Sequence, residues 1–456
     1  MILKNKLKEE PGFQYVVDNL DLMSGVGRHR LLAQPWLTNA DELDRELDRV
    51  EQMLHLLQQE DNSRNIVVIR HKLMGLHDIA TSLGNLKGGF LLNEIQLFEI
   101  KHLSLLYAEA SRAAKEIGVS ALLPLDLSDI FDLLDPDHTG IANFYVYDSY
   151  DPRLAALRKA LKADPDNTDL FAQQEEVQNA VVERLSLQLQ PAADRLLAAL
   201  DQMAYLDVLL AKASQALQWG LTRPEIASQD ASIQFTTLFN PRLRHHKEEQ
   251  GLRYQPVDIA LQAGVCLVTG ANMAGKTVLL KTMGVAQTMA QFGMFVPAQK
   301  ARLSLVDDVV FSIGDEQNEM NGLSSFASEI IKISDIVKRA RRERLLVLID
   351  EPARTTNPIE GKAIVQAICK LLQGTPHTVA LITTHYNQLG LPCRRLRVRG
   401  FVEDMADVAL SPQNINCFMD YTLLPDDSDD VPQEALRIAT ILGCDEELLS
   451  VAKGLL

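Results

Sequence analysis

A chain of 456 residues with 46% hydrophobic residues is long enough for two or three domains with large cores. Its net charge of -16 argues against a protein built as a whole to hold polyanions, although a local basic patch still could. The sequence has no apolar run of membrane-spanning length, no apolar signal core at its N-terminus, and no C-x-x-C spacing among its five cysteines. We therefore expect a soluble cytoplasmic protein without a zinc site or a disulfide framework.

Helical patterns dominate residues 1–225. Leucine and valine recur at spacings of three and four over residues 43–57, which is typical of an amphipathic helix. An N-cap at Asn93 predicts a second helix to about residue 117, and Asp151-Pro152 predicts another through residue 161. Such apolar stripes usually pack in the protein core. The alternative is that they bind a partner.

Three stretches within this half break the helical pattern. We interpret residues 84–89 as a loop, residues 144–147 as a short strand, and residues 164–167 as a linker. From about residue 232 short apolar runs alternate with helical segments, which predicts a parallel sheet with crossover helices. The clearest predicted strands are residues 265–269, 345–349 and 379–383.

A glycine-containing segment at residues 270–277 has the G-x-x-x-x-G-K-[ST] pattern of a phosphate-binding loop between a strand and a helix. Gly270 and Gly275 let the backbone turn tightly, and the loop amides converge on phosphates. Lys276 is suited to the β- and γ-phosphates and the Thr277 hydroxyl to Mg²⁺. The remaining loop residues are Ala271, Asn272, Met273 and Ala274. A glycine turn before an ordinary helix is the alternative, which the preceding strand disfavours.

Polar side chains follow the other two clear strands. Asp350 is placed to hold Mg²⁺ through water, and Glu351 to orient or activate the attacking water. His385 is suited to sensing a γ-phosphate, and a structural histidine is its alternative. Ser324 lies just before a helix that contains Glu329, where it would cap the helix or present its hydroxyl to an anion.

Together these segments resemble the MutS family of ATPases. The similar segments are residues 269–277 (family TGPNMGGKS), 296–298 (VPA), 322–329 (GRSTFMVE), 348–356 (LMDEIGRGT) and 384–386 (THY). The resemblance implies an α/β P-loop ABC-like ATPase domain, preceded by an all-α core and lever domain and followed by a helix-turn-helix. It places these domains at residues 1–225, 226–430 and 431–456.

The resemblance also implies cofactors and further site residues. ATP and Mg²⁺ would be bound, and Tyr254, in a stretch similar to the family's FVPND, would stack on adenine. The ATPase domains would dimerise head to tail, so that Ser324 reaches the γ-phosphate of the partner subunit. The dimer would be a homodimer or a heterodimer with a related subunit, with residues 431–456 as its dimerisation element.

The departures from the family pattern concern the DNA-contacting parts. We expect no mismatch-reading or connector domain before Met1. After Arg158 the family inserts a long DNA-gripping clamp, whereas here only about thirty residues separate that point from the returning helix. Pro352, Ala353 and Thr355 replace Ile, Gly and Gly after the acidic pair.

We therefore expect a dimeric, Mg²⁺-dependent ATPase that couples nucleotide state to lever movement on a macromolecular partner. By family this partner is DNA, bound weakly and without mismatch recognition. The run at residues 350–358 also resembles MutS-like ATPases associated with reactivating a cobalamin-dependent lysine aminomutase, so a protein-remodelling function stays open. An inactive scaffold is disfavoured by intact Lys276, Asp350 and Glu351.

Overall fold

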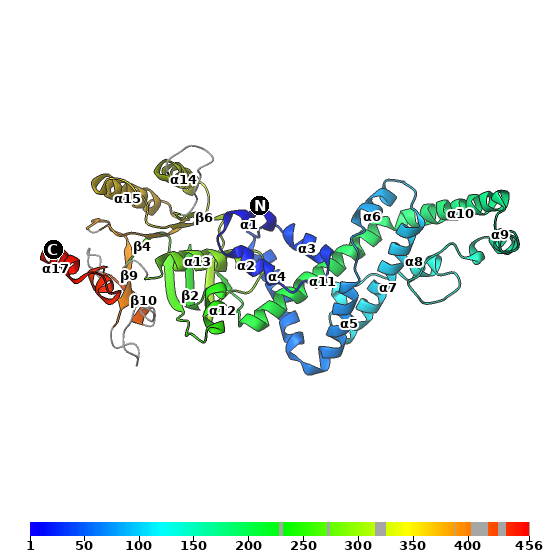
Figure 1. Ribbon diagram of the computed structural model, residues 1–456, viewed down its shortest axis with the longest axis horizontal. Helices are drawn as coiled ribbons and strands as arrows, with labels where there is room; N and C mark the ends of the chain where they lie inside the picture. The colour runs from blue at the N-terminus through cyan, green and yellow to red at the C-terminus, as the bar shows by residue number, and fades with distance from the viewer. Residues whose placement is uncertain are drawn as a thin grey trace. The chain divides into compact units, whose positions relative to one another are not determined.

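The chain forms two compact units in the computed structural model (Figure 1). The first unit contains Met1–Asn19, Pro35–Asp48 and Gln215–Leu456, and the second contains Leu20–Gln34 and Arg49–Ser214. The structure describes residues 1–227, 231–270, 274–314, 325–386, 388–402, 418–426 and 435–455. No helix within these ranges is long and apolar enough to cross a membrane.

The N-terminal half is helical, as the sequence predicts. Its helices are α1 (Leu3–Glu9), α2 (Phe13–Asp18), α3 (Gly25–Leu32), α4 (Ala40–Gln58), α5 (Ser63–Met74), α6 (Ala80–Lys87), α7 (Glu94–Glu116), α8 (Ser128–Leu134), α9 (Pro152–Ala163), α10 (Thr168–Leu189) and α11 (Ala193–Trp219). The three helices predicted from stripes and caps correspond to α4, α7 and α9. Asn93 caps α7 in a reciprocal capping box with Gln96.

Two of the short non-helical predictions were wrong. Residues 84–87 belong to α6, because burial of Leu83 and Leu86 outweighs the about 1 kcal/mol that a glycine costs inside a helix. Residues 144–147 form no strand. The carbonyl of Val146 accepts a hydrogen bond from the guanidinium of Arg158 rather than from a neighbouring strand. A side-chain donor therefore replaces the strand partner that the composition of this stretch led us to expect.

The C-terminal half is α/β. Its strands are β1 (Glu225–Ala227), β2 (Ser232–Leu238), β3 (Val257–Gln262), β4 (Gly264–Thr269), β5 (Lys300–Ser304), β6 (Asp308–Ser312), β7 (Leu345–Ile349), β8 (Val379–Thr383), β9 (Arg394–Phe401) and β10 (Met419–Pro425). Its helices are α12 (Pro241–Glu249), α13 (Lys276–Gln291), α14 (Ser325–Ala340), α15 (Pro358–Gln373), α16 (Ala435–Ile441) and α17 (Glu446–Gly454).

The strands form two sheets. The larger has the order β10-β9-β4-β8-β7-β6, in which only β10 is antiparallel to its neighbour. The smaller has the order β1-β5-β2-β3. The predicted strands β4, β7 and β8 lie in the larger sheet and are parallel, which confirms the predicted parallel sheet with crossover helices.

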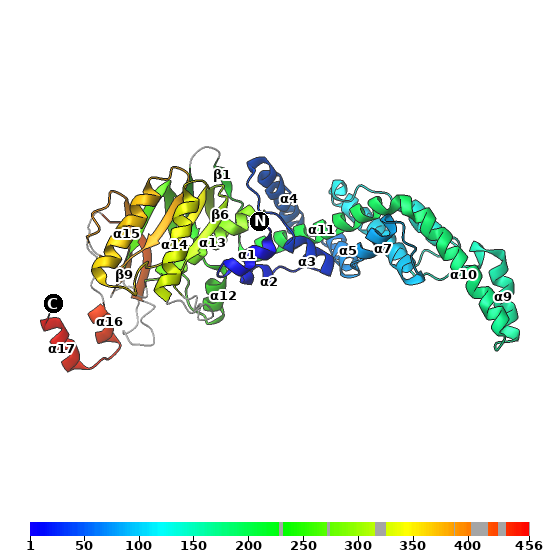
Figure 2. The same cartoon turned by 90° about the horizontal axis from the view of Figure 1, so that it is seen from above.

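Both faces of the larger sheet are covered by helices, with α14 and α15 on one face and α13 on the other (Figures 1 and 2). Leu345, Val347 and Ile349 of β7 pack in the core cluster that contains residues of α14 and α15. Leu348 points the opposite way, toward Gly284 of α13. A strand buried on both faces is apolar at every position, and this explains the unbroken run of β7.

The N-terminal segment packs against the C-terminal half within the first unit. Phe13 stacks on Phe292 at the end of α13, with ring centroids 5.8 Å apart. The indole of Trp36 donates to the carbonyl of Val306. The buried ammonium of Lys6 lies 2.7 Å from the carboxylate of Asp308.

Glu10 is a buried carboxylate in this contact. The hydroxyl of Thr288 on α13 donates to its Oε2, whereas Oε1 has no hydrogen-bond partner among the described residues. Burial is the main cause that raises the pKa of Glu10 to about 7, against the opposing effect of Lys6. An acid with a raised pKa in the folded state binds a proton more tightly there than in the unfolded chain.

We predict that ionisation of Glu10 lowers the free energy of unfolding as the pH rises from about 4.5 to about 7. Above about pH 7 this loss of stability stays constant. Glu10→Gln should remove this loss and stabilise the protein at pH 8 by roughly 3 kcal/mol, with little effect near pH 4.5. The free energy of unfolding in urea at several pH values measures the effect. Glu9→Gln, the exposed neighbour, is the matched control. A gain that does not depend on pH would contradict the prediction.

Candidate functional site

The predicted phosphate loop connects the carboxyl end of β4 to the start of α13. Gly270 has φ 149° and Gly275 has φ 76°, backbone conformations that favour glycine. Gly275 is also the N-cap residue of α13. A Cβ atom on Gly275 would lie 3.1 Å from the ring of Tyr421, so the ring approaches the backbone closely there.

Lys276 is buried at the first position of α13. Its ammonium donates to the carbonyl of Gly270 at 2.7 Å and lies 3.2 Å from the Oε1 atom of Glu351. Only 5% of the lysine side chain and 14% of the glutamate side chain are exposed. The predicted phosphate-binding cation and the predicted catalytic acid are thus direct neighbours.

Asp350 lies between two threonine hydroxyls. Thr277 of α13 donates to Oδ2 at 2.5 Å, and Thr383 at the end of β8 donates to Oδ1 at 2.6 Å. Thr383 also accepts a hydrogen bond from the backbone N–H of Glu351. Because β4, β8 and β7 are parallel neighbours in that order, their carboxyl ends bring these residues to one edge of the sheet.

Glu351 is held as an anion in a constrained backbone. Burial opposes its ionisation, but Lys276 and Arg354 outweigh burial and lower the pKa of the carboxyl. Glu351 and Ala353 have φ values of 43° and 60°, which are unusual for residues with a side chain. The hydroxyl of Tyr386 donates to the carbonyl of Ala353 and helps to hold this turn.

His385 follows β8 and lies at the same edge. Partial desolvation lowers the pKa of its imidazole, and the charge of Glu351 opposes that shift. The positive charges of Lys276 and Arg354 lower the pKa further. The ring of His385 packs against that of Tyr386 at 4.3 Å between centroids. The histidine is therefore near the acidic pair, with its neutral form favoured.

A second part of the site is a pocket of about 250 Å³ beside Gly275. Tyr254 and Tyr421 both line it, and the ammonium of Lys247 lies 5.9 Å and 5.7 Å from their ring centroids. The hydroxyl of Tyr254 accepts a hydrogen bond from the backbone N–H of Asn240. We call this cavity the tyrosine pocket.

The structure brings together most of the residues predicted from sequence: Tyr254, Gly270, Ala274, Gly275, Lys276, Thr277, Asp350, Glu351 and His385. Ala271, Asn272, Met273 and Ser324 lie outside the described residues. Sequence reasoning missed Thr383, Tyr421 and Lys247. Thr383 could have been inferred as the last residue of a parallel strand, whereas no local pattern marks Tyr421 or Lys247.

The donor set at Asp350 fits a magnesium ion. Mg²⁺ is commonly held by one or two carboxylates together with substrate phosphates and water, rather than by a cage of protein ligands. The Thr277 hydroxyl and the Asp350 carboxylate supply two suitable oxygens side by side. No cluster of three or more His, Cys, Asp or Glu side chains that could hold a metal occurs in the described ranges.

Comparisons with known proteins agree with this arrangement. Residues 266–455 match MutS domain V. The chain is 32% identical over 283 residues to DNA mismatch repair protein MutS of Myxococcus xanthus, covering 60% of this chain and 30% of the relative. It is 33% identical over 221 residues to endonuclease MutS2 of Caldanaerobacter subterraneus, covering 48% and 27%. It is 36% identical over 194 residues to DNA mismatch repair protein msh3 of Aspergillus fumigatus, covering 41% and 17%.

These matches and the α/β architecture define the C-terminal half as a MutS domain V. Over this region the chain is similar to proteins of the MutS family. It spans 30% or less of the length of the three curated relatives described above.

We predict that Gly275→Ala destabilises the protein more than Gly251→Ala. Both glycines have positive φ, 76° and 69°, so alanine costs about 1 kcal/mol of backbone strain at either position. Only at Gly275 does the new Cβ meet a close neighbour, because nothing lies within 4 Å of it at Gly251. Urea denaturation of both variants measures the difference. Equal losses of stability would contradict the close packing of Tyr421.

Proposed function

We propose that the protein is a Mg²⁺-dependent ATPase of the MutS type. The observation that carries this proposal is the meeting of Lys276, Thr277, Asp350 and Glu351 at the carboxyl edge of one parallel sheet. A glycine loop that begins a helix at this edge is suited to phosphates, because its amides and the helix dipole favour anions. The MutS domain V match over residues 266–455 supports the same function.

The residues divide the chemistry among them. Lys276 binds phosphate oxygens, and the Thr277 hydroxyl and Asp350 hold Mg²⁺, which neutralises phosphate charge when bound. Glu351, kept ionised by its neighbours, orients the attacking water and accepts its proton. His385, whose lowered pKa favours the neutral imidazole, would contact the terminal phosphate as a neutral donor.

The tyrosine pocket is suited to the base of the nucleotide. Its volume of about 250 Å³ fits a flat ring rather than a whole nucleotide. Tyr254 and Tyr421 offer aromatic surfaces for stacking, and Gly275 in its wall places the pocket directly beside the phosphate loop. We assign adenine to this pocket, with Tyr254 as predicted and Tyr421 as an additional contact.

We predict that Lys276→Ala abolishes tight ATP binding, whereas Glu351→Gln retains binding and loses turnover by at least a hundredfold. Lys276 meets charge already present in bound phosphate, whereas Glu351 acts on water only in the chemical step. Equilibrium binding and single-turnover hydrolysis of each variant separate the two effects. Glu360→Gln, an acid in the first turn of α15, is the control for loss of one charge. Unimpaired hydrolysis by Glu351→Gln would reject the role of this residue.

We further propose that the protein works as a dimer, either of identical subunits or with a related subunit. The observation in favour is the exposed apolar face of α17 and its C-cap, where Leu448, Val451 and the C-cap residue Leu455 are 64%, 58% and 84% exposed. Their spacing places them on one side of a helix. In this proposal residues 431–456 are the helix-turn-helix dimerisation element, and Ser324 acts across the ATPase interface.

The partner that we propose is DNA, as the names of the MutS-family relatives suggest, bound without mismatch recognition. Nucleotide-dependent movement of the ATPase domains would be passed to it by the helical unit, which serves as the lever. Within this unit, the hairpin of α9 and α10 lies at the position in the sequence where the clamp of the family begins. It has five Lys and Arg residues and six Asp and Glu residues from Pro152 to Leu189, so it offers DNA no excess of positive charge.

A protein client is the second candidate, and the same hairpin favours it. Its turn carries the exposed acids Asp164, Asp166 and Asp169, followed by Phe171, which is 60% exposed. An aromatic ring beside carboxylates is better suited to a basic protein surface than to phosphates. This alternative corresponds to a protein-remodelling ATPase that reactivates a metabolic enzyme, the lysine aminomutase type.

We predict that DNA binding is weak, falls steeply with salt and does not distinguish mismatched from paired duplexes. Binding that depends on phosphate contacts is independent of sequence. The slope of the logarithm of the binding constant against the logarithm of the salt concentration is proportional to the number of those contacts. Titration of both duplexes at about 50 and about 200 mM salt, with and without ATP, tests this. Asp164→Asn/Asp166→Asn should strengthen binding to both duplexes equally if the hairpin approaches DNA. A tenfold mismatch preference, about 1.4 kcal/mol, that persists at the higher salt concentration would overturn the prediction.

A further inference from the structure

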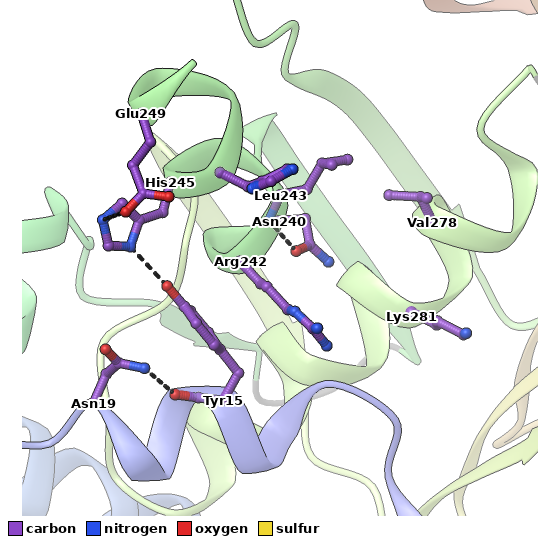
Figure 3. Close-up of a pocket in the computed structure, with 10 residues that line it drawn as sticks. Tyr15, Asn19, Asn240, Arg242, Leu243, His245, Glu249, Val278 and Lys281 are labelled. Carbon is purple, nitrogen blue, oxygen red and sulfur yellow. Dashed lines mark hydrogen bonds and ion pairs between the residues drawn. The ribbon is translucent and has the colours of Figure 1, made fainter. Parts of the chain in front are cut away.

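A second cavity lies between α2, α12 and the first turns of α13 (Figure 3). It has a volume of about 530 Å³ and is lined by residues from three helices, α2, α12 and α13. We call it the α2–α12 pocket. Its size is typical of small-molecule sites, which range over about 300–1,000 Å³.

The pocket is distinct from the tyrosine pocket. The two cavities share Leu243 and Val278 in their linings, and these apolar side chains separate them. Neither Lys276 nor Asp350 lines the α2–α12 pocket. A ligand here would therefore occupy a site of its own beside the nucleotide site.

Two cations in this pocket have no partner. Arg242 extends from α12 toward the space between Tyr15 and α13, and Lys281 projects from α13 (Figure 3). Neither side chain makes a hydrogen bond or an ion pair with any residue that the structure describes. Burial of the ring and the charge of Glu249 raise the pKa of the Tyr15 phenol, against the smaller opposing effect of Arg242.

The other polar groups of the pocket are held in place. The hydroxyl of Tyr15 lies 2.7 Å from Nδ1 of His245, whose Nε2 lies 3.6 Å from Glu249. The ring of Tyr15 stacks on Trp219 with centroids 5.9 Å apart, which fixes one wall. Glu249 is the sole carboxylate in the lining and is engaged by His245, so the pocket has a net positive charge.

We propose that the α2–α12 pocket binds a phosphorylated small molecule. Arg242 and Lys281 would bind the phosphate oxygens, because guanidinium and ammonium groups are the strongest donors to such anions. Leu243, Val278 and the ring of Tyr15 provide an apolar surface for the rest of the molecule. The volume of the cavity exceeds what a single phosphate group needs, which favours a phosphorylated metabolite over inorganic phosphate.

The probe for the test is pyrophosphate, titrated calorimetrically onto the full-length Lys276→Ala variant. Disabling the phosphate loop in this way separates the test from the proposed ATPase function, since the result does not depend on ATP binding. We expect saturable binding to remain. Adding Arg242→Ala/Lys281→Ala should weaken it at least tenfold, whereas Lys338→Ala/Lys370→Ala, which removes the same charge from exposed positions of α14 and α15, should not.

A second variant is expected to bind pyrophosphate more tightly, a result that misfolding cannot produce. Glu249→Gln removes the carboxylate of the pocket and should tighten pyrophosphate binding severalfold, with the fold checked by circular dichroism. Absence of saturable binding to the Lys276→Ala protein would overturn the proposal. Equal binding by the Arg242→Ala/Lys281→Ala protein and the matched control would overturn it as well.

Discussion

The carboxylate of Asp350 connects three segments that are far apart in the sequence. One oxygen accepts from Thr277 at the start of α13, and the other accepts from Thr383 at the end of β8. Asp350 directly follows β7, so a single side chain connects the edge of the sheet to the first turn of the helix. Hydrogen bonds to a charged acceptor are about twice as strong as neutral ones, and this connection therefore fixes the geometry on which the rest of the site depends.

The ion pair between Lys276 and Glu351 has a different character. In the proposed function its two members have opposite tasks, since Lys276 would attract phosphate and Glu351 would act on water. In the structure they neutralise each other at 3.2 Å in a largely buried place. A ligand that takes the lysine as its partner must release the glutamate from it. In the proposed function, Glu351 would therefore be free of Lys276 only while phosphate is bound.

Much of the site could be predicted from the sequence because its parts are local. The glycine loop, Lys276 and Thr277 are contiguous, and the acidic pair follows a strand whose apolar run shows burial on both faces. The parallel strands β4, β7 and β8 were predicted for the same reason. Tyr421 could not be found in this way, because its place beside Gly275 depends on β10 pairing with β9 at the end of the sheet.

Long-range packing also explains the other differences. Residues 144–147 have the composition of a strand, but a strand also needs a neighbouring strand to pair with. Here the side chain of Arg158 bonds to the backbone at Val146 instead. Likewise, nothing in the pattern of residues 1–19 shows that they pack against α13. That contact depends on single pairs such as Phe13 with Phe292, which are separated by most of the chain.

The division of the chain into units has a consequence for synthesis at the ribosome. The chain passes between the units after Asn19, Gln34, Asp48 and Ser214, so neither unit is a contiguous stretch of sequence. Residues 1–19 are synthesised long before most of the strands and helices on which they pack, because these follow Gln215. Until then their apolar side chains stay exposed, and closing such distant contacts is slow. During this long interval a chaperone that covers these apolar side chains protects the nascent chain from aggregation.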